Sequence, residues 1–474
     1  MRWILYFCPM HLPNQADTIC ALATAPGLGA IAVIRVSGPD TFRIIETVFK
    51  TKKGKSKDFS SIKSHTLHFG DIILDNQTLD EVLISVFKNP HSYTGQDTIE
   101  ISCHGSTYIQ QQILQLLQQK GARLAEPGEF TLRAFLNGKL DLSQAEAVAD
   151  LIASQHASAH QTAMQQLRGG YSHAIQELRT QLLNFASLIE LELDFAEEDV
   201  EFANRDQLSK LVHELLKSVR TLRESYATGN ALKNGIPVVI AGKPNVGKST
   251  LLNALLNDNK AIVSDIAGTT RDVIEDQLII DGYRFRFMDT AGLRSTGDAI
   301  EKLGVERSYE YARKANIILY LCDPAQSTVK EIEEEITDLQ NKVGEDKFIL
   351  TVVNKCDLHD QSKLGDYSTL PNVIFIAAKT QLHLEELKKQ LIIGSGVASL
   401  ENENQLVTNA RHEGALAKAE EALVRVTDGM QSHLTSDLLA LDLKDAIYHL
   451  GLITGEIYSD DLLGNIFSKF CIGK

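Results

Sequence analysis

The residues with the most specific chemical pattern run from Gly242 to Ser249, with the sequence Gly-Lys-Pro-Asn-Val-Gly-Lys-Ser. This is the P-loop pattern, in which a glycine-rich turn joins a strand to a helix and its backbone N–H groups surround phosphate oxygens. Lys248 can reach the β- and γ-phosphates, and the Ser249 hydroxyl can bind Mg²⁺. We expect a strand before the turn and a helix from Thr250 after it, whose N-terminus favours anions. The pattern predicts a site for a nucleoside triphosphate.

Two later tetrapeptides indicate which nucleotide fits, and each follows an apolar run typical of a strand. In Asp289–Gly292 (Asp-Thr-Ala-Gly) the carboxylate can hold the Mg²⁺ shell, and the last N–H can contact the γ-phosphate. In Asn354–Asp357 (Asn-Lys-Cys-Asp) the final carboxylate can accept hydrogen bonds from N1–H and N2–H₂ of guanine. Adenine lacks these donors, so its nucleotides are rejected by roughly 10⁴-fold or more. Together the three motifs predict a GTP-binding domain.

The region around these motifs, residues 234–396, alternates apolar runs with helical patterns, as a doubly wound α/β domain does. Ligands of such sheets bind at the carboxyl ends of the strands, which is where the motifs lie. The expected strands are Pro237–Ala241, Gln277–Ile280, Phe285–Met288, Ile317–Cys322, Phe348–Val353 and Val373–Ile376.

Because 474 residues are too many for one core, we expect more than one domain. The N-terminal part of the chain, residues 1–137, has the pattern of a second α/β region. Gly29–Val36 and Thr98–Ser102 are strand-like, and Ile109–Lys120 has apolar residues at helical spacing with Gly121 after it. Although Gly27-Leu28-Gly29 resembles part of a dinucleotide-binding fingerprint, a strand rather than a helix follows it. We therefore expect no dinucleotide site there.

Long helical patterns lie before and after the nucleotide-binding region in the sequence. Ser143 and Glu146 have the spacing of a capping box, and the helical pattern then continues to about Gly229. It returns after the inserted domain, most clearly at Ser436–Leu450. The fold class expected is therefore α/β and α multidomain. A helical domain of residues 138–233 and 397–474 is split by the P-loop domain of residues 234–396.

Composition excludes several classes of protein. The net charge of −15 argues against a non-specific nucleic-acid coat protein, and no apolar run is long enough to span a bilayer. The six scattered cysteines fit a reducing compartment, and the first ten residues do not fit a signal peptide. We expect Lys50–Lys57 to be a solvated loop, with an RNA-facing loop as the alternative. Cys103-His104 is expected to be buried and neutral.

Further motifs resemble one family of GTPases. Leu293 stands where Ras-like proteins place the glutamine that orients water. Together with Asn245 and Gly268–Asp272 (Gly-Thr-Thr-Arg-Asp), it resembles the potassium-activated GTPases that work by dimerising their G domains. The C-terminal Cys-Ile-Gly-Lys after Ser459–Gly464, and Glu129-Phe-Thr through Phe135-Leu-Asn-Gly-Lys-Leu-Asp, narrow the resemblance to the MnmE (TrmE) tRNA-modification GTPases.

This resemblance implies a role for each matching residue. Lys248 and Glu301 act in catalysis, with Glu301 positioning the attacking water. Ser249 and Thr270 hold Mg²⁺. The K⁺ ligands are Asn245, Ser264, Ile266 and Thr269. Arg35, Glu100, Lys139 and Lys474 form a pocket for 5-formyltetrahydrofolate, and Cys471 lies in the modification site. The GTP-binding residues implied are Asn245, Val246, Gly247, Lys248, Ser249, Thr250, Ser264, Asp265, Ile266, Ala267, Gly268, Thr269, Thr270, Asp289, Thr290, Ala291, Gly292, Asn354, Lys355 and Asp357.

The resemblance also implies a function: a cytoplasmic, homodimeric GTPase that modifies C5 of the wobble uridine of certain tRNAs. Its partner would be a flavin-dependent protein of the MnmG or GidA type, and GTP hydrolysis would drive opening and closing of the G domains. The alternative is an Era-like ribosome-assembly GTPase, although the acidic helical C-terminal region lacks the basic RNA-binding module expected there. For Cys471, a buried thiol and a reactive or hydrogen-bonding role both stay open.

Overall fold

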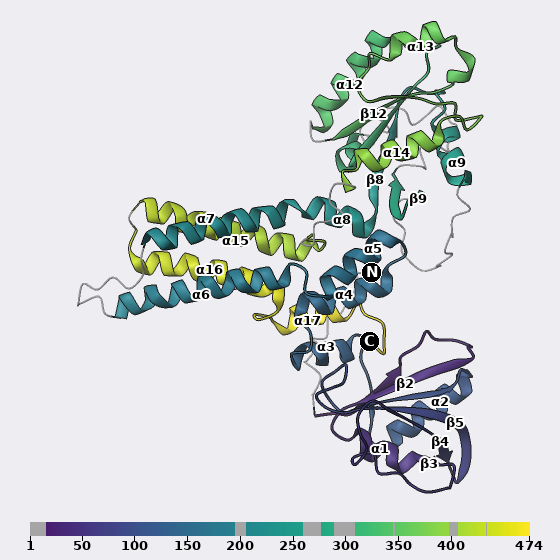
Figure 1. The fold of residues 1–474 in the computed structure, drawn as a ribbon, viewed down its shortest axis with the longest axis vertical. Coiled ribbons are helices and arrows are strands. Elements are labelled where there is room, and N and C mark those ends of the chain that lie inside the picture. The colour runs from purple at the N-terminus through teal and green to yellow at the C-terminus, as the bar shows by residue number, and fades with distance from the viewer. Residues whose placement is uncertain are drawn as a thin grey trace, which may run out of the picture. The chain divides into compact units, whose positions relative to one another are not determined.

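The computed structural model describes residues 16–194, 205–258, 276–288, 309–344, 347–397, 406–432 and 434–474. These residues form two compact units. The first contains the N-terminal α/β region with residues 166–213 and 418–474, and the second contains residues 150–165 and 214–417. The coloured ribbon in Figure 1 shows that each unit is built from segments far apart in the sequence.

A seven-stranded sheet in the order β3-β4-β5-β6-β2-β1-β7 forms the N-terminal region, and its neighbouring strands are antiparallel except for β1 and β7. Side chains of β2 alternate, so that Ile34 is buried while Arg35 faces the opposite side of the sheet. The strands are β1 Ile19–Leu22, β2 Ile31–Ser37, β3 Phe49–Thr51, β4 Thr66–Leu74, β5 Gln77–Phe87, β6 Thr98–His104 and β7 Arg123–Leu124.

Helices α1 (Thr41–Val48) and α2 (Thr107–Gln119) cover the buried face of this sheet. Their apolar residues, such as Ile45 and Leu117, form one core with the inward side chains of the strands. The predicted strands in this region and the predicted helix are confirmed, with bounds that differ by two residues at most.

Long helices make up most of the remaining described residues before and after the nucleotide-binding region. Helices α6 and α16 lie side by side in the first unit, although the whole nucleotide-binding region lies between them in the sequence (Figure 1). The helices are α3 Glu129–Leu136, α4 Leu142–Ala153, α5 Ala157–Leu167, α6 Ser172–Asp194, α7 Arg205–Glu224, α8 Tyr226–Asn234, α15 Ala410–Gln431, α16 Ser436–Thr454 and α17 Asp460–Phe467.

Two local predictions about these helices are wrong. The helix α4 begins at Leu142, so the capping box is formed by Asp141 and Gln144 rather than by Ser143 and Glu146. The Asp141 carboxylate accepts from the Gln144 N–H at 2.8 Å, and the Gln144 side chain accepts from the Asp141 N–H at 2.9 Å. The helical pattern also continues past Gly229, because α8 runs to Asn234 and Gly229 lies against the Val407 backbone.

The nucleotide-binding region has a six-stranded sheet in the order β13-β12-β11-β8-β10-β9, parallel except for the β9–β10 pair. Each predicted strand is confirmed to within two residues at either end, because parallel strands buried on both faces read as apolar runs. The strands are β8 Ile236–Ala241, β9 Asp276–Ile280, β10 Tyr283–Phe287, β11 Ile317–Cys322, β12 Phe348–Val353 and β13 Val373–Phe375.

Helices pack on both faces of this sheet, which makes it doubly wound as predicted. Helices α9 (Lys248–Asp258) and α14 (Leu384–Gly394) share one core with the sheet. Helices α12 (Val329–Val343) and α13 (Gln361–Tyr367) share the core on the other face. Within the described ranges, no helix combines the length and apolar character needed to cross a bilayer.

Candidate functional site

The P-loop connects the carboxyl end of β8 to the first turn of α9. Gly242 and Gly247 have φ angles of 134° and 107°, in the region that favours glycine. A Cβ atom at Gly242 would lie 2.1 Å from the Leu321 carbonyl oxygen, and one at Gly247 would lie 2.4 Å from the Asn354 amide nitrogen. Both glycines of the motif are therefore required by the close approach of neighbouring atoms.

Lys248 is the first residue of α9, so the helix begins two residues earlier than the predicted Thr250. Its ammonium group donates to the carbonyl oxygens of Gly242 at 2.6 Å and Lys243 at 2.9 Å. Burial lowers the pKa of Lys248. A half-buried cation above a helix N-terminus is an arrangement that favours a bound phosphate.

Asn354 joins the P-loop to the guanine-reading motif. Its side chain lies at the carboxyl end of β12 and is buried. It donates to the Val246 carbonyl oxygen at 2.8 Å and accepts from the Ala378 N–H at 3.0 Å. Both halves of the amide are therefore used to fix the loops around the expected base.

Lys355 and Asp357 follow Asn354 at the same sheet edge. Lys355 has a left-handed backbone, with φ at 61°, and its ammonium donates to the Asn245 carbonyl oxygen at 3.2 Å. Asp357 lies in a short 3₁₀ helix, Cys356–Leu358, and its side chain is exposed. The tertiary structure thus places the Asn354–Asp357 motif against the P-loop, as the motif order predicts.

Several of the predicted nucleotide-site residues lie outside the described residues. Neither their placement nor their roles are tested, and they stay predictions. They are Ser264, Asp265, Ile266, Ala267, Gly268, Thr269, Thr270, Asp289, Thr290, Ala291, Gly292, Leu293 and Glu301.

A second group of predicted site residues meets on the side of the N-terminal sheet opposite the core that α1 and α2 share with it. Arg35 on β2 pairs with Glu100 on β6, with two guanidinium nitrogens each 2.9 Å from the same carboxylate oxygen. The Arg35 guanidinium also lies over the rings of Tyr93 and Phe130, at 5.3 and 5.5 Å from their centroids. The sequence patterns did not identify these two aromatic residues as part of the site.

The C-terminal tail reaches this group of residues. Arg35 donates to the Gly473 carbonyl oxygen at 3.4 Å, across 438 residues of sequence. Gly473 has a φ of 95°, and a Cβ atom there would lie 2.1 Å from the Leu22 carbonyl oxygen. The tail therefore packs against the sheet at a position that only glycine can occupy. The Lys474 N–H donates to the Cys471 carbonyl oxygen at 3.3 Å.

Lys139 and Cys471 are both exposed. The stem of Lys139 passes the backbone of Gly95, where an added Cβ atom would lie 3.2 Å from the Lys139 Cε. For Cys471, the exposed thiol contradicts the alternative in which the residue is buried. The backbone carbonyl of Cys471 accepts from the Gly128 N–H and the Lys474 N–H, which anchors the tail at this residue while the thiol stays exposed.

Comparison with known proteins assigns the chain to a family. Residues 142–471 match the family described as the MnmE helical domain, and residues 18–139 match the one described as the GTP-binding protein TrmE N-terminus. The chain belongs to the MnmE family. The tRNA modification GTPase MnmE of Christiangramia forsetii is 54% identical over 473 residues, which cover 97% of this chain and 99% of the relative. That of Flavobacterium johnsoniae is 55% identical over 468 residues, which cover 97% and 100%.

Membership of the MnmE family makes this chain a GTP-hydrolysing enzyme of a tRNA-modifying family. The α/β and α multidomain fold class that its sequence predicts is confirmed as well.

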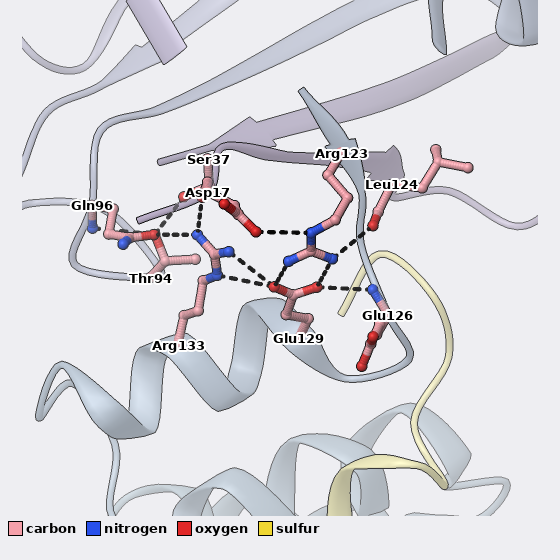
Figure 2. Close-up of polar contacts among 9 residues, drawn as sticks. All are labelled: Asp17, Ser37, Thr94, Gln96, Arg123, Leu124, Glu126, Glu129 and Arg133. Atoms are coloured by element: carbon pink, nitrogen blue, oxygen red, sulfur yellow. Dashed lines mark hydrogen bonds and ion pairs between the residues drawn. The ribbon is translucent and has the colours of Figure 1, made fainter. Parts of the chain in front are cut away.

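A buried charge network supports the N-terminal site of this MnmE family member, and the sequence patterns gave no role to its residues. Figure 2 shows Glu129, the first residue of α3, between the guanidinium groups of Arg123 and Arg133. Its carboxylate is 2.7 Å from Arg123 and 2.9 Å from Arg133, and it accepts from the Glu126 N–H at 2.9 Å. Arg133 also donates to the Asp17 carbonyl oxygen at 2.7 Å.

The adjacent Cys103 and His104 point to opposite sides of β6, so the prediction that both are buried is only half right. Cys103 is buried, and burial raises the pKa of its thiol to about 11. The His104 side chain is 68% exposed, and its Nδ1 lies 2.6 Å from a carboxylate oxygen of Asp80. Neighbouring residues in a strand alternate between faces, which separates the pair. The prediction that Lys50–Lys57 is a solvated loop is correct only in part, because Lys50 and Thr51 belong to β3, whereas residues 52–56 are exposed.

Proposed function

We propose that this enzyme is a potassium-activated GTPase that modifies C5 of the wobble uridine of certain tRNAs. The group installed is of the aminomethyl or carboxymethylaminomethyl type. The reaction uses 5-formyltetrahydrofolate as one-carbon donor and a flavin-dependent partner of the MnmG or GidA type. The observation that carries the proposal is the N-terminal site, in which Arg35 and Glu100 meet the C-terminal tail at Gly473.

The proposed folate pocket fits a pterin ring chemically. The two nitrogens of Arg35 that contact Glu100 converge on one carboxylate oxygen. The other oxygen of Glu100 accepts no hydrogen bond from a described residue. A pterin carries two neighbouring N–H donors that such a carboxylate can accept. Lys139 and Lys474 would bind the acidic tail of the folate. The bound folate supplies the one-carbon group, and the residues of this chain hold and orient it.

Several described residues of the GTP-binding motifs have separate roles in this proposal. Lys248 offers positive charge to the β- and γ-phosphates, Ser249 holds Mg²⁺, and Asp357 reads the guanine edge. A K⁺ ion held by Asn245, Ser264, Ile266 and Thr269 would supply the charge that an arginine finger supplies elsewhere, and Glu301 would position the water. Asn245 fits this role because its left-handed backbone, with φ at 62°, leaves the residue exposed at the loop.

A second copy of the chain fits the exposed side of the N-terminal sheet. Leu67, Phe69 and Leu83 are 67%, 53% and 44% exposed there, and Phe69 is paired directly with Leu83. The strand registers continue this face to Glu100 and Arg35. Exposed apolar groups that adjoin a ligand site are typical of an interface. We therefore propose a homodimer formed through this face, with the α/β domain of residues 1–137 as the dimerisation domain.

The remaining parts of the proposal concern the GTPase cycle, the role of Cys471 and the place where the enzyme works. GTP binding and hydrolysis in the domain of residues 234–396 drives G-domain dimerisation, and the helical domain of residues 138–233 and 397–474 carries the change to the modification site. Cys471 is exposed beside the proposed pocket, which gives it access to bound tRNA. GTP hydrolysis changes the conformation of the enzyme and does not supply the one-carbon group. The enzyme works in the cytoplasm, where tRNA and its flavoprotein partner are present.

GTP turnover in KCl and in NaCl at matched ionic strength tests the potassium assignment. We expect K⁺ to accelerate turnover by at least about tenfold, since a cation in the arginine-finger position contributes about 10³–10⁵ in rate. Asn245→Ala should remove the acceleration, whereas Asn341→Ala, on the far α12 helix, should keep it. Equal rates in the two salts would contradict the potassium site.

Mass analysis of wobble uridines tests the modification itself. A strain without this gene should lack the C5 group, and the wild-type gene should restore it. Arg35→Ala should fail to restore it while GTP turnover continues, because Arg35 lies in the N-terminal site. Restoration by Arg35→Ala would contradict the folate assignment.

A further inference from the structure

Asp323 lies at the carboxyl end of β11, next to the base-reading motif, and none of the nucleotide-binding motifs includes it. Its side chain is 4% exposed. One carboxylate oxygen accepts from the Lys355 ammonium at 2.8 Å, and the other accepts from the Ala325 N–H at 2.9 Å. Nε2 of His359 lies 3.4 Å from that second oxygen. One oxygen of this buried carboxylate therefore contacts Lys355 of the Asn354–Asp357 turn, and the other contacts the loop that follows Asp323.

The segment that carries Asp323 is held firmly from the other side. The Asp323 carbonyl oxygen accepts from the N–H groups of Gln326 at 2.8 Å and Ser327 at 3.2 Å. The buried Tyr367 hydroxyl donates to the Ser327 carbonyl oxygen at 2.6 Å. These bonds fix the backbone from which the Asp323 carboxylate projects.

Lys355 connects this carboxylate to the P-loop. Its backbone is in the left-handed region, which disfavours a lysine unless the surroundings impose it. The same ammonium that bonds to Asp323 donates to the Asn245 carbonyl oxygen at 3.2 Å. The Lys355 ammonium therefore links the end of β11 to the phosphate-binding loop, two residues before Asp357 in the sequence.

Burial by itself would raise the pKa of Asp323, but the hydrogen bonds from Lys355 and Ala325, together with the lysine charge, hold the pKa below its usual value. Asp323 is therefore ionised at neutral pH. Its charge meets the ammonium of Lys355, whose side chain is 34% exposed, in a charge-assisted and directional hydrogen bond.

We propose that Asp323 is a positioning residue of the guanine-nucleotide site, which holds Lys355 in the geometry that binds the base. The inference rests on the proposed role of Lys355 and Asp357 in guanine binding. Binding is tighter when a contact residue is fixed before the ligand arrives, because less side-chain freedom is then lost. Without the carboxylate, the Lys355 ammonium would lose this partner, and its link to the Asn245 carbonyl oxygen would weaken.

The test is a double-mutant cycle on nucleotide affinity in the full chain. Affinity for a fluorescent GDP analogue is measured in the wild type, Asp323→Asn, Lys355→Met and the double variant. We expect Asp323→Asn to weaken binding by about tenfold or more, as the loss of a hydrogen bond between charged groups implies. The effects should not add, because the two side chains act as one unit. In GTP turnover, KM should rise while kcat changes little.

Two further variants separate positioning from simple stabilisation. Asp323→Glu keeps the charge and should retain more affinity than Asp323→Asn. Asp338→Asn removes an exposed carboxylate that pairs with Lys342 on α12, and it should leave affinity unchanged. Thermal unfolding of each variant shows whether the fold is intact.

The outcomes separate failure of this inference from failure of the proposed site. Unchanged affinity in Asp323→Asn, with weaker binding in Lys355→Met, would overturn the positioning role and leave the guanine site standing. Additive losses in the double variant, or lower affinity in Asp323→Glu than in Asp323→Asn, would also overturn it. Unchanged affinity in Lys355→Met would instead contradict the assignment of Lys355 to the base site, and the positioning role would fall with it.

Discussion

Replacing Glu129 with glutamine should destabilise the N-terminal α/β region by about 3–5 kcal/mol, because the change breaks a buried ion pair. The Glu129 side chain is 0% exposed and that of Arg133 is 1% exposed, whereas Arg123 is 37% exposed. Glutamine keeps one acceptor oxygen, but its amide group would face a guanidinium donor. The charge of Arg133 would then stay buried without a counter-charge, which accounts for most of the loss.

Hydrogen exchange followed by mass spectrometry on the full chain measures this change where it occurs. Peptides covering α3 and β7 should exchange about a hundredfold to a few thousandfold faster in Glu129→Gln, if opening of this region controls exchange. The matched control is Glu126→Gln, an exposed carboxylate whose backbone N–H, not its side chain, bonds to Glu129. The control should exchange like the wild type.

The pH dependence gives a second reading of the same network. Burial would raise the pKa of Glu129, but hydrogen bonds from Arg123 and the Glu126 N–H, with the charges of both arginines, hold the pKa below its usual value. The unfolded chain, with a Glu pKa of about 4.3, therefore binds the proton first. The stabilisation is complete above about pH 4.3 and is lost as pH falls through the folded-state pKa.

The difference in stability between wild type and Glu129→Gln should accordingly shrink as pH falls from about 5 toward 3. A difference that stays constant over that range would refute the charge-based reasoning. So would an exchange rate for α3 in Glu129→Gln that equals the rate in Glu126→Gln. Either result would mean that packing alone, and not the ion pairs, holds α3 to the sheet.

Three other substitutions test the nucleotide and folate sites. Asp357→Asn should lose preference for GTP and gain affinity for xanthosine nucleotides, measured by competition; unchanged GTP affinity would contradict its role as base reader. Gly247→Ala should weaken nucleotide binding by at least about tenfold in the same assay, because the new Cβ would lie 2.4 Å from the Asn354 amide nitrogen at a φ of 107°. Arg35→Ala should abolish binding of 5-formyltetrahydrofolate in calorimetry without changing GTP affinity, and normal folate binding would place that ligand elsewhere.

Much of the nucleotide-binding fold could be predicted because its signals are local. Each strand of a doubly wound sheet is buried on both faces, so strands such as β11 and β12 stand out as apolar runs, and their predicted bounds match. The glycines of the P-loop are local signals as well, since the turn itself needs residues that tolerate their backbone angles. The order of the motifs along the chain then places them at one sheet edge.

Local spacing was misleading where several residues could fill one role. Both Asp141/Gln144 and Ser143/Glu146 have the three-residue spacing of a capping box, and only the first pair forms it. Spacing could not decide between them, because the choice depends on where the chain enters the helix. For the same kind of reason, sequence adjacency did not reveal that His104 would be exposed beside a buried Cys103.

By itself, the sequence determined the P-loop, the Asn354–Asp357 motif and the family, because each motif that indicates them is a short run of neighbouring residues. Tertiary structure alone decided that Gly473 would reach Arg35 across 438 residues, that Tyr93 and Phe130 would pack on that guanidinium, and that Asp323 would hold Lys355. These contacts depend on which strands pair and on how the chain ends pack. Their free energy comes from burial and charge between distant segments, which leaves no periodic signal in the sequence.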